Sequence, residues 1–181
     1  MLGHEDILGG VPYPIGMPDT LPKLLERSTL AEKLLPLREA GKTVVLCNGV
    51  FDLLHVGHTR VLAAAAAKGD VLVVAINDDA SARMHKGSGR PIHPAIERAE
   101  ILSALSCVDW ICMFSEETVA ATLQAIQPNI HAKGEDYDPE RIPSDEQLVA
   151  EELGIQLALV GGPKVNSSSQ IADSLEQGRA S

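Results

Sequence analysis

Cysteine is scarce in this sequence, and the three that occur, Cys47, Cys107 and Cys112, show no C-x-x-C spacing. An odd number of cysteines in apolar surroundings does not make a disulfide framework, and their spacing does not fit a zinc site. We therefore expect buried thiols in a reducing compartment, and no metal held by the protein's own side chains.

Long apolar runs are also absent. No stretch approaches the roughly 20 apolar residues that span a bilayer, and the chain shows no basic and then apolar signal-peptide layout. The sequence therefore predicts a cytoplasmic protein that does not act at a membrane. With 181 residues, 45% of them hydrophobic, the chain is long enough for one domain with a sizeable core.

Positive charge is in deficit, because 15 Lys and Arg stand against 25 Asp and Glu and leave a net charge of −10. A broad basic face for nucleic acid is therefore not expected. A local cationic cluster can still bind a small phosphorylated ligand. The sequence also lacks the G-x-x-x-x-G-K-[ST] and G-x-G-x-x-G motifs, which argues against P-loop kinases and nicotinamide enzymes.

What the sequence does contain is an alternation of short apolar runs with helix-like segments. This pattern predicts an α/β protein with a Rossmann-like, doubly wound, parallel five-stranded sheet and helices on both faces. Such sheets bind ligands at the carboxyl ends of their strands. The predicted strands are 44–48, 71–77, 110–114, 130–132 and 156–160, and the predicted helices between and after them are 58–68, 94–105, 116–127, 144–153 and 167–177.

Two further elements precede this pattern. Residues 1–27 are rich in glycine and proline and are predicted to form an irregular arm, so that the folded domain covers residues 28–181. A first helix is expected to be capped by Ser28 or Thr29 and to stop at Gly41.

The most informative segment is His55-Val-Gly-His58, at the first predicted junction of strand and helix. Two histidines three apart lie on one side of the first helical turn, where free backbone N–H groups and the helix dipole favour an anion. Gly57 leaves room for a phosphate to approach the backbone. A purely structural histidine pair is the alternative, but the position between strand and helix favours a polyphosphate site.

A basic loop is predicted after the second strand and contains Arg83, Lys86 and Arg90. Loop charges often serve solubility alone. Because this loop lies at the ligand-binding end of the predicted sheet, we favour phosphate contact, with Arg90 suited to bidentate binding.

A run of serines, Ser167 to Ser169, opens the last predicted helix. Serine is a preferred helix cap in any protein. Hydroxyls and free N–H groups at a helix start also bind anions, so both interpretations stay open.

Together these segments resemble the nucleotidyltransferase superfamily with the H-x-G-H signature, and within it the cytidylyltransferase-like group. The lysine-glycine and arginine-proline pairs of the basic loop are most similar to heptose 1-phosphate adenylyltransferases, including those that form the C-terminal domain of a bifunctional heptose kinase/adenylyltransferase. The likeness runs from about Thr29 to about Leu175. It is carried by residues 48–58, 86–91, 97–98, 108–110, 133–137 and 167–171.

The resemblance implies a reaction in which a sugar phosphate, D-glycero-β-D-manno-heptose 1-phosphate, attacks the α-phosphorus of ATP and releases pyrophosphate. A phosphate monoester is already a nucleophile near neutral pH, so alignment and charge neutralisation should suffice. Mg²⁺ is expected to come with the nucleotide and to be held largely by phosphates and water. A homodimer is also expected.

The resemblance assigns roles to individual residues. Catalysis falls to His55, His58 and Lys86, with a protonated His58 stabilising the charge on the reacting phosphate. The implied nucleotide-binding residues are Asn48, Gly49, Val50, Phe51, Gly57, Lys133, Ser167, Ser168 and Ser169. The implied acceptor-binding residues are Asp52, Arg83, Arg90, Glu135 and Asp136.

Two alternatives stay open at this point. One is cytidylyl transfer to glycerol 3-phosphate or a related polyol phosphate, since the choice of base and sugar rests on the resemblance alone. The other is a nucleotide-binding module without turnover, which the joint presence of the histidines, the basic loop and the serines disfavours.

Overall fold

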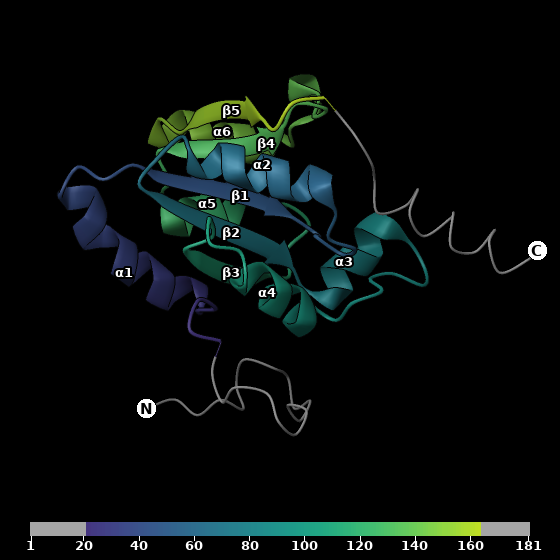
Figure 1. Ribbon diagram of the computed structural model, residues 1–181. Coiled ribbons are helices and arrows are strands. Elements are labelled where there is room, and N and C mark those ends of the chain that lie inside the picture. The colour runs from purple at the N-terminus through teal and green to yellow at the C-terminus, as the bar shows by residue number, and fades with distance from the viewer. Residues whose placement is uncertain (1–20, 164–181) are drawn as a thin grey trace, which may run out of the picture.

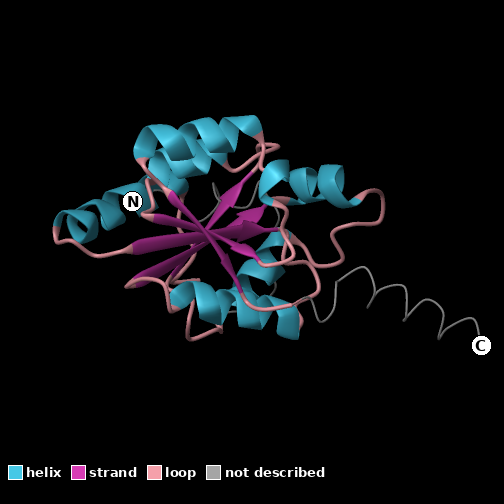
Figure 2. Ribbon diagram, turned by 90° about the horizontal axis from the view of Figure 1, so that it is seen from above, coloured by secondary structure: helices cyan, strands magenta, loops and turns pink. Residues whose placement is uncertain are grey.

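The computed structural model describes residues 21–163, which form a parallel sheet between two layers of helices (Figures 1 and 2). The strand order is β3-β2-β1-β4-β5, and every pairing is parallel. The predicted Rossmann-like fold is therefore confirmed. The strands are β1 (Val44–Gly49), β2 (Val71–Asn77), β3 (Trp110–Phe114), β4 (Ile130–Gly134) and β5 (Gln156–Val160).

The helices divide between the two faces of the sheet. Buried side chains of α2 and α4 belong to one hydrophobic cluster. Those of α1 and α5 belong to the other, and partly buried residues of α6 pack against it. Within residues 21–163, none of the helices has both the length and the apolar character needed to cross a bilayer. The helices are α1 (Arg27–Glu39), α2 (Val56–Ala66), α3 (Asp79–Lys86), α4 (Ala95–Ser103), α5 (Ala120–Ile126), α6 (Ser144–Leu153) and the short 3-10 helix η2 (Pro139–Arg141).

The strands read as continuous apolar runs because both of their faces are buried. In β1, Val45 and Cys47 pack toward α2 and α4, while Val44 and Leu46 pack toward α1 and α5. Burial raises the pKa of the Cys47 thiol to about 12. The predicted buried thiols are confirmed for Cys47 and Cys112, which are free cysteines.

The order in which strands are added to the sheet reverses at β1, which pairs with β2 on one side and with β4 on the other. Helices leave to opposite faces at such a switch point, which opens a crevice at the carboxyl ends of the two central strands. Asn48 of β1 and Lys133 of β4 lie at these ends. This is where the sequence predicted a ligand site.

The last residues of the predicted arm lie along the edge of the sheet. Leu24 is buried and forms a parallel bridge with Ile111 of β3. The backbone N–H of Ile111 donates to Lys23 O (2.7 Å), and Leu25 N–H donates to Ile111 O (2.9 Å). Residues 21–26 therefore cover the edge of β3, which strand edges generally need.

The start of α1 differs from the prediction. The helix begins at Arg27, with Glu26 as its cap and no side-chain cap bond, so the predicted cap at Ser28 or Thr29 is wrong. Because the chain turns directly from the sheet edge at Leu25 into the helix, the Glu26 carbonyl already accepts from Leu30 N–H. Gly41 follows the helix with φ +76°, as its predicted stop requires.

The predicted basic loop is partly helical, which corrects the prediction for Arg83 and Lys86. Both lie on α3, an amphipathic helix with few buried residues, and only Arg90 lies in the loop that follows. The Asp78 carboxylate caps this helix by accepting from Ser81 N–H (2.7 Å). An aspartate at this position is a sequence signal for the start of a helix. The helix was not predicted because it has too few apolar residues to show a helical periodicity.

Several other helix boundaries differ from the predictions, and two helices differ most. Helix α2 begins at Val56 rather than at His58, and α5 covers only Ala120–Ile126 of the predicted 116–127. The predicted helix 167–177 lies outside the described residues.

Candidate active site

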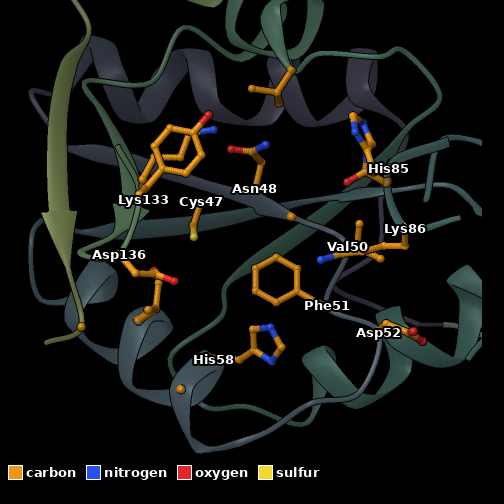
Figure 3. A pocket seen from close by; sticks show the side chains of 18 of the residues that line it. Cys47, Asn48, Val50, Phe51, Asp52, His58, His85, Lys86, Lys133 and Asp136 are labelled. Carbon is orange, nitrogen blue, oxygen red and sulfur yellow. The ribbon is translucent and has the colours of Figure 1, made fainter. Parts of the chain in front are cut away.

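A cavity of about 440 Å³ opens at the carboxyl ends of the strands. Figure 3 shows Lys133 and Asp136 on one side of it, His85 and Lys86 on the other, and His58 between them. The first two come from the end of β4 and the turn after it, and the second two from the end of α3. Segments far apart in the sequence thus meet around the start of α2.

The two histidines form a reciprocal cap on α2. His55 is the N-cap residue, and its Nδ1 accepts from Gly57 N–H (3.1 Å), while Nδ1 of His58 accepts from His55 N–H (3.4 Å). Their rings stack with centroids 4.0 Å apart. In this capping box, two backbone donors of the first turn are satisfied by imidazoles in place of the usual hydroxyl and carboxylate.

The cap also determines the protonation of His58. Burial, with the neighbouring charges of His55 and Lys86, lowers the pKa of His58 to about 4. The ring is therefore neutral near pH 7, and because Nδ1 accepts a backbone N–H, its proton lies on Nε2. In the protein alone the ring is thus a neutral N–H donor, and because bound phosphates would raise this pKa, protonation of His58 during the reaction stays a prediction.

Phe51 packs against the His58 ring. Its ring centroid lies 5.3 Å from that of His58, and the residue is buried. Phe51 has φ +49°, a left-handed conformation that is uncommon for a bulky residue. A Cβ on Gly49 would lie only 3.2 Å from the Phe51 ring, so the small residue there allows this conformation.

A buried ion pair builds the wall beside β4. Nζ of Lys133 lies 3.3 Å from Oε2 of Glu146, with side chains only 8% and 4% exposed. Oε1 of Glu146 accepts from Val119 N–H (3.2 Å), so one carboxylate ties α6 to both β4 and the start of α5. Lys133 also lies over the Tyr137 ring, 4.8 Å from its centroid.

Asp52 holds the loop that follows α3. Its carboxylate pairs with Arg90 and accepts from Ile92 N–H (2.7 Å) and His93 N–H (3.0 Å). Behind this loop, the fully buried Arg98 donates to the Val50 carbonyl (2.6 Å). Arg90 and Asp52 therefore neutralise each other at the edge of the site.

Glycine at position 161 brings the end of β5 against α2. A Cβ there would lie 2.5 Å from Val61 Cγ2, and φ is +98°. This close approach places residues 161–163 in the cavity wall.

Most of the predicted site residues that the structure describes line this one cavity. They are Asn48, Gly49, Val50, Phe51, Asp52, His55, Gly57, His58, Lys86, Lys133 and Asp136. Arg83, Arg90 and Glu135 are not among the lining residues, and Ser167, Ser168 and Ser169 lie outside the described part of the chain. Among residues 21–163, no three His, Cys, Asp or Glu side chains cluster as a metal site would require.

Sequence reasoning missed two residues that shape the site, Glu146 and His131. Asn77 lies at the carboxyl end of the second predicted strand, where the fold predicts a ligand, but the sequence gives it no role. Glu146 reads as an ordinary acidic residue in a first helical turn. His131 reads as a core histidine, yet its Nε2 lies 2.8 Å from Oδ1 of Asn48 and positions that side chain. No local pattern identifies these contacts, because their partners are distant in sequence or on another element.

Because His131 is buried, we expect the free energy of unfolding to decrease in acid. Burial, together with Lys133, lowers the pKa of His131 to about 3 from an ordinary 6.5. As pH falls below 6.5, the unfolded chain binds the proton first, so this contribution to stability declines from about pH 6.5 down to about pH 3. A His131→Gln variant, whose amide can still donate to Asn48, should show a shallower decline.

Urea unfolding of both proteins at intervals from about pH 7 to about pH 4.5 measures this difference. Equal slopes of unfolding free energy against pH would contradict a neutral, buried His131. The loss attributable to His58 has the same sign and remains in both proteins, so it cancels in the comparison.

A parallel sheet with a histidine-capped helix at its switch point is the arrangement of nucleotidyltransferases with the H-x-G-H signature. The chain belongs to the cytidylyltransferase-like family, whose model matches residues 46–172.

Two curated proteins are similar to this chain over most of its length. A bifunctional protein HldE from Desulfatibacillum aliphaticivorans is 41% identical over 87% of this chain and 32% of its own length. Another from Geotalea uraniireducens is 40% identical over 89% of this chain and 32% of its own length. The chain thus spans about a third of the length of these curated relatives.

A solved structure is also similar. The crystal structure of the lipopolysaccharide core biosynthesis protein from Thermoplasma volcanium GSS1 has a TM-score of 0.57 and 30% sequence identity, and the match covers 70% of this chain and all of that one.

Proposed function

We propose that this protein transfers an adenylyl group from ATP to D-glycero-β-D-manno-heptose 1-phosphate, forming ADP-heptose and pyrophosphate. The observation that carries the proposal is the histidine-capped start of α2, which lies between two lysine-bearing walls of one cavity. The bifunctional relatives and the lipopolysaccharide core biosynthesis protein support a role in nucleotide-sugar synthesis.

In this reaction the protein mainly has to align the two substrates. An oxygen of the sugar phosphate forms a bond to the α-phosphorus while the bond from that phosphorus to the β-phosphate oxygen breaks, and pyrophosphate leaves. The nucleophile is already ionised, so no side chain has to remove a proton. Donors aimed at the phosphate oxygens supply the stabilisation, as in other phosphoryl transfers.

The proposed donors surround the start of α2. Nε2–H of His58 binds phosphate oxygens, aided by the dipole of α2. Lys86 and Lys133 neutralise phosphate charge from opposite sides of the cavity (Figure 3). His55 orients the turn through its bond to Gly57 N–H.

The two walls suit different substrates. Beside β4, the Tyr137 ring and Lys133 offer an aromatic face and a cation, which suits a nucleotide base and its phosphates. Beside α3, the cavity carries Lys86 with polar neighbours, which suits a sugar phosphate. We therefore propose the nucleotide on the β4 side and the sugar phosphate on the α3 side.

Mg²⁺ is part of this proposal and would neutralise the triphosphate. The ion prefers oxygen ligands and keeps several waters. Asp136 and Glu117 are the cavity-lining carboxylates outside the two buried ion pairs, so the residues present fit an ion held mainly by the nucleotide and water. The homodimer and the cytoplasmic location also remain proposals, and light scattering would measure the first.

Pyrophosphate release with ATP or CTP, each paired with heptose 1-phosphate or glycerol 3-phosphate, tests the function. We expect turnover with ATP and the heptose phosphate. Turnover only with CTP and glycerol 3-phosphate would instead establish the cytidylyltransferase alternative. Nucleotide binding without pyrophosphate release from any pair would establish a non-catalytic module.

A further inference from the structure

Asn77 is a buried polar residue in the cavity wall to which the mechanism above gives no role. It ends β2, pairs in register with Phe114 of β3, and is only 4% exposed. It lines the cavity and contacts Ser81 of α3, the helix that also carries Lys86. A buried amide needs hydrogen-bond partners for both its oxygen and its nitrogen.

The orientation of the Asn77 amide follows from a chain of hydrogen bonds. The Glu116 carbonyl can only accept, so the Ser81 hydroxyl donates its single proton to it (3.0 Å). Oγ of Ser81 must then accept at its other contact, which is with Asn77 at 2.7 Å. Nδ2 of Asn77 therefore faces Ser81.

Oδ1 of Asn77 is thereby directed away from Ser81. Among residues 21–163, no side chain or backbone group donates to this oxygen, although the residue lies in the cavity wall. Leaving a buried acceptor unpaired is costly. A substrate group that donates a hydrogen bond would remove that cost.

We propose that Oδ1 of Asn77 accepts a hydrogen bond from a hydroxyl of the sugar phosphate and selects acceptors that carry this hydroxyl. The inference rests on the proposed function and on binding of the sugar phosphate at the α3 side. A site built to bind a substrate hydroxyl strongly rejects analogues that lack it, because its own polar group is then left unpaired. Asn77 is thus a specificity-determining residue for the acceptor.

Substrate analogues test this without depending on how much protein is folded. The ratio of kcat/KM for heptose 1-phosphate to that for each monodeoxy analogue is unchanged by inactive protein. In the wild type, we expect one analogue to lose about 10- to 100-fold. In Asn77→Ala this loss should shrink to near unity, while the losses for the other analogues and the KM for ATP should persist.

A matched control removes an amide at the opposite end of the sheet. Asn129 precedes β4, and its Oδ1 accepts from Val44 N–H (2.8 Å), so Asn129→Ala should leave every analogue ratio at its wild-type value. Ser81→Ala removes the group that orients Asn77, and should reduce the same single ratio as Asn77→Ala.

The outcomes separate the inference from the proposed function. An active wild type whose analogue ratios survive in Asn77→Ala would overturn the inference alone. Loss of discrimination against 2′- or 3′-deoxy-ATP, with the sugar ratios unchanged, would assign Asn77 to the nucleotide and also overturn it. No pyrophosphate release by the wild type with any sugar phosphate would overturn both.

Discussion

Replacing His58 by alanine is expected to lower kcat by at least about 10²-fold, because one preorganised donor to the reacting phosphates is removed. The neutral ring presents its proton on Nε2, opposite the nitrogen that accepts from His55 N–H. The same change removes half of the capping box and should cost about 1 kcal/mol of unfolding free energy. Steady-state pyrophosphate release and urea unfolding measure the two effects.

The variant His58→Gln separates capping from catalysis. Glutamine is a common third residue of a capping box and can accept from His55 N–H, so most of the lost stability should return. Activity should stay low, because an amide whose oxygen accepts from His55 N–H does not place its own N–H group where Nε2–H of the imidazole lies. Near-normal turnover in His58→Ala would remove the basis for placing the reaction at the start of α2.

Replacing Glu146 by alanine should destabilise the protein by about 3–5 kcal/mol, because it leaves the buried Lys133 ammonium without its partner. The Val119 N–H also loses its acceptor, so the wall formed by residues 117–119 should loosen. We therefore expect a higher KM for the nucleotide as well. Denaturant unfolding at neutral pH gives the change in stability.

Two comparisons identify the cause. The double variant Glu146→Ala/Lys133→Met should be more stable than Glu146→Ala alone, because it buries no unpaired charge. Glu152→Ala removes an exposed carboxylate from the same helix and should change stability by no more than about 0.5 kcal/mol. Equal instability of the single and double variants would show that the ion pair is not the reason.

The fold was largely predictable because its signals are local. Each strand is a short apolar run, and the helices between them predict parallel pairing. Helix α6 lies at its predicted boundaries, Ser144–Leu153. Helix α3 was missed because it buries little and shows its charged residues instead.

The location of the candidate site was predictable from the sequence, but the contacts between its side chains were not. Residues at the ends of predicted strands do line one cavity, since parallel strands bring their carboxyl ends together. Arg90 reads as a free phosphate-binding cation, but the structure pairs it with Asp52. Asn77 reads as a polar strand end, and only its bond to Ser81 orients it.

By itself, the sequence determined the α/β class, the switch-point location of the site and the histidine pair at the start of α2. These follow from periodicity and motif spacing over a few neighbouring residues. The tertiary structure decided the lowered pKa of His58, the Lys133–Glu146 pair and the direction of the Asn77 amide. Burial and hydrogen-bond partners arise only when distant segments pack together, so no local pattern encodes them.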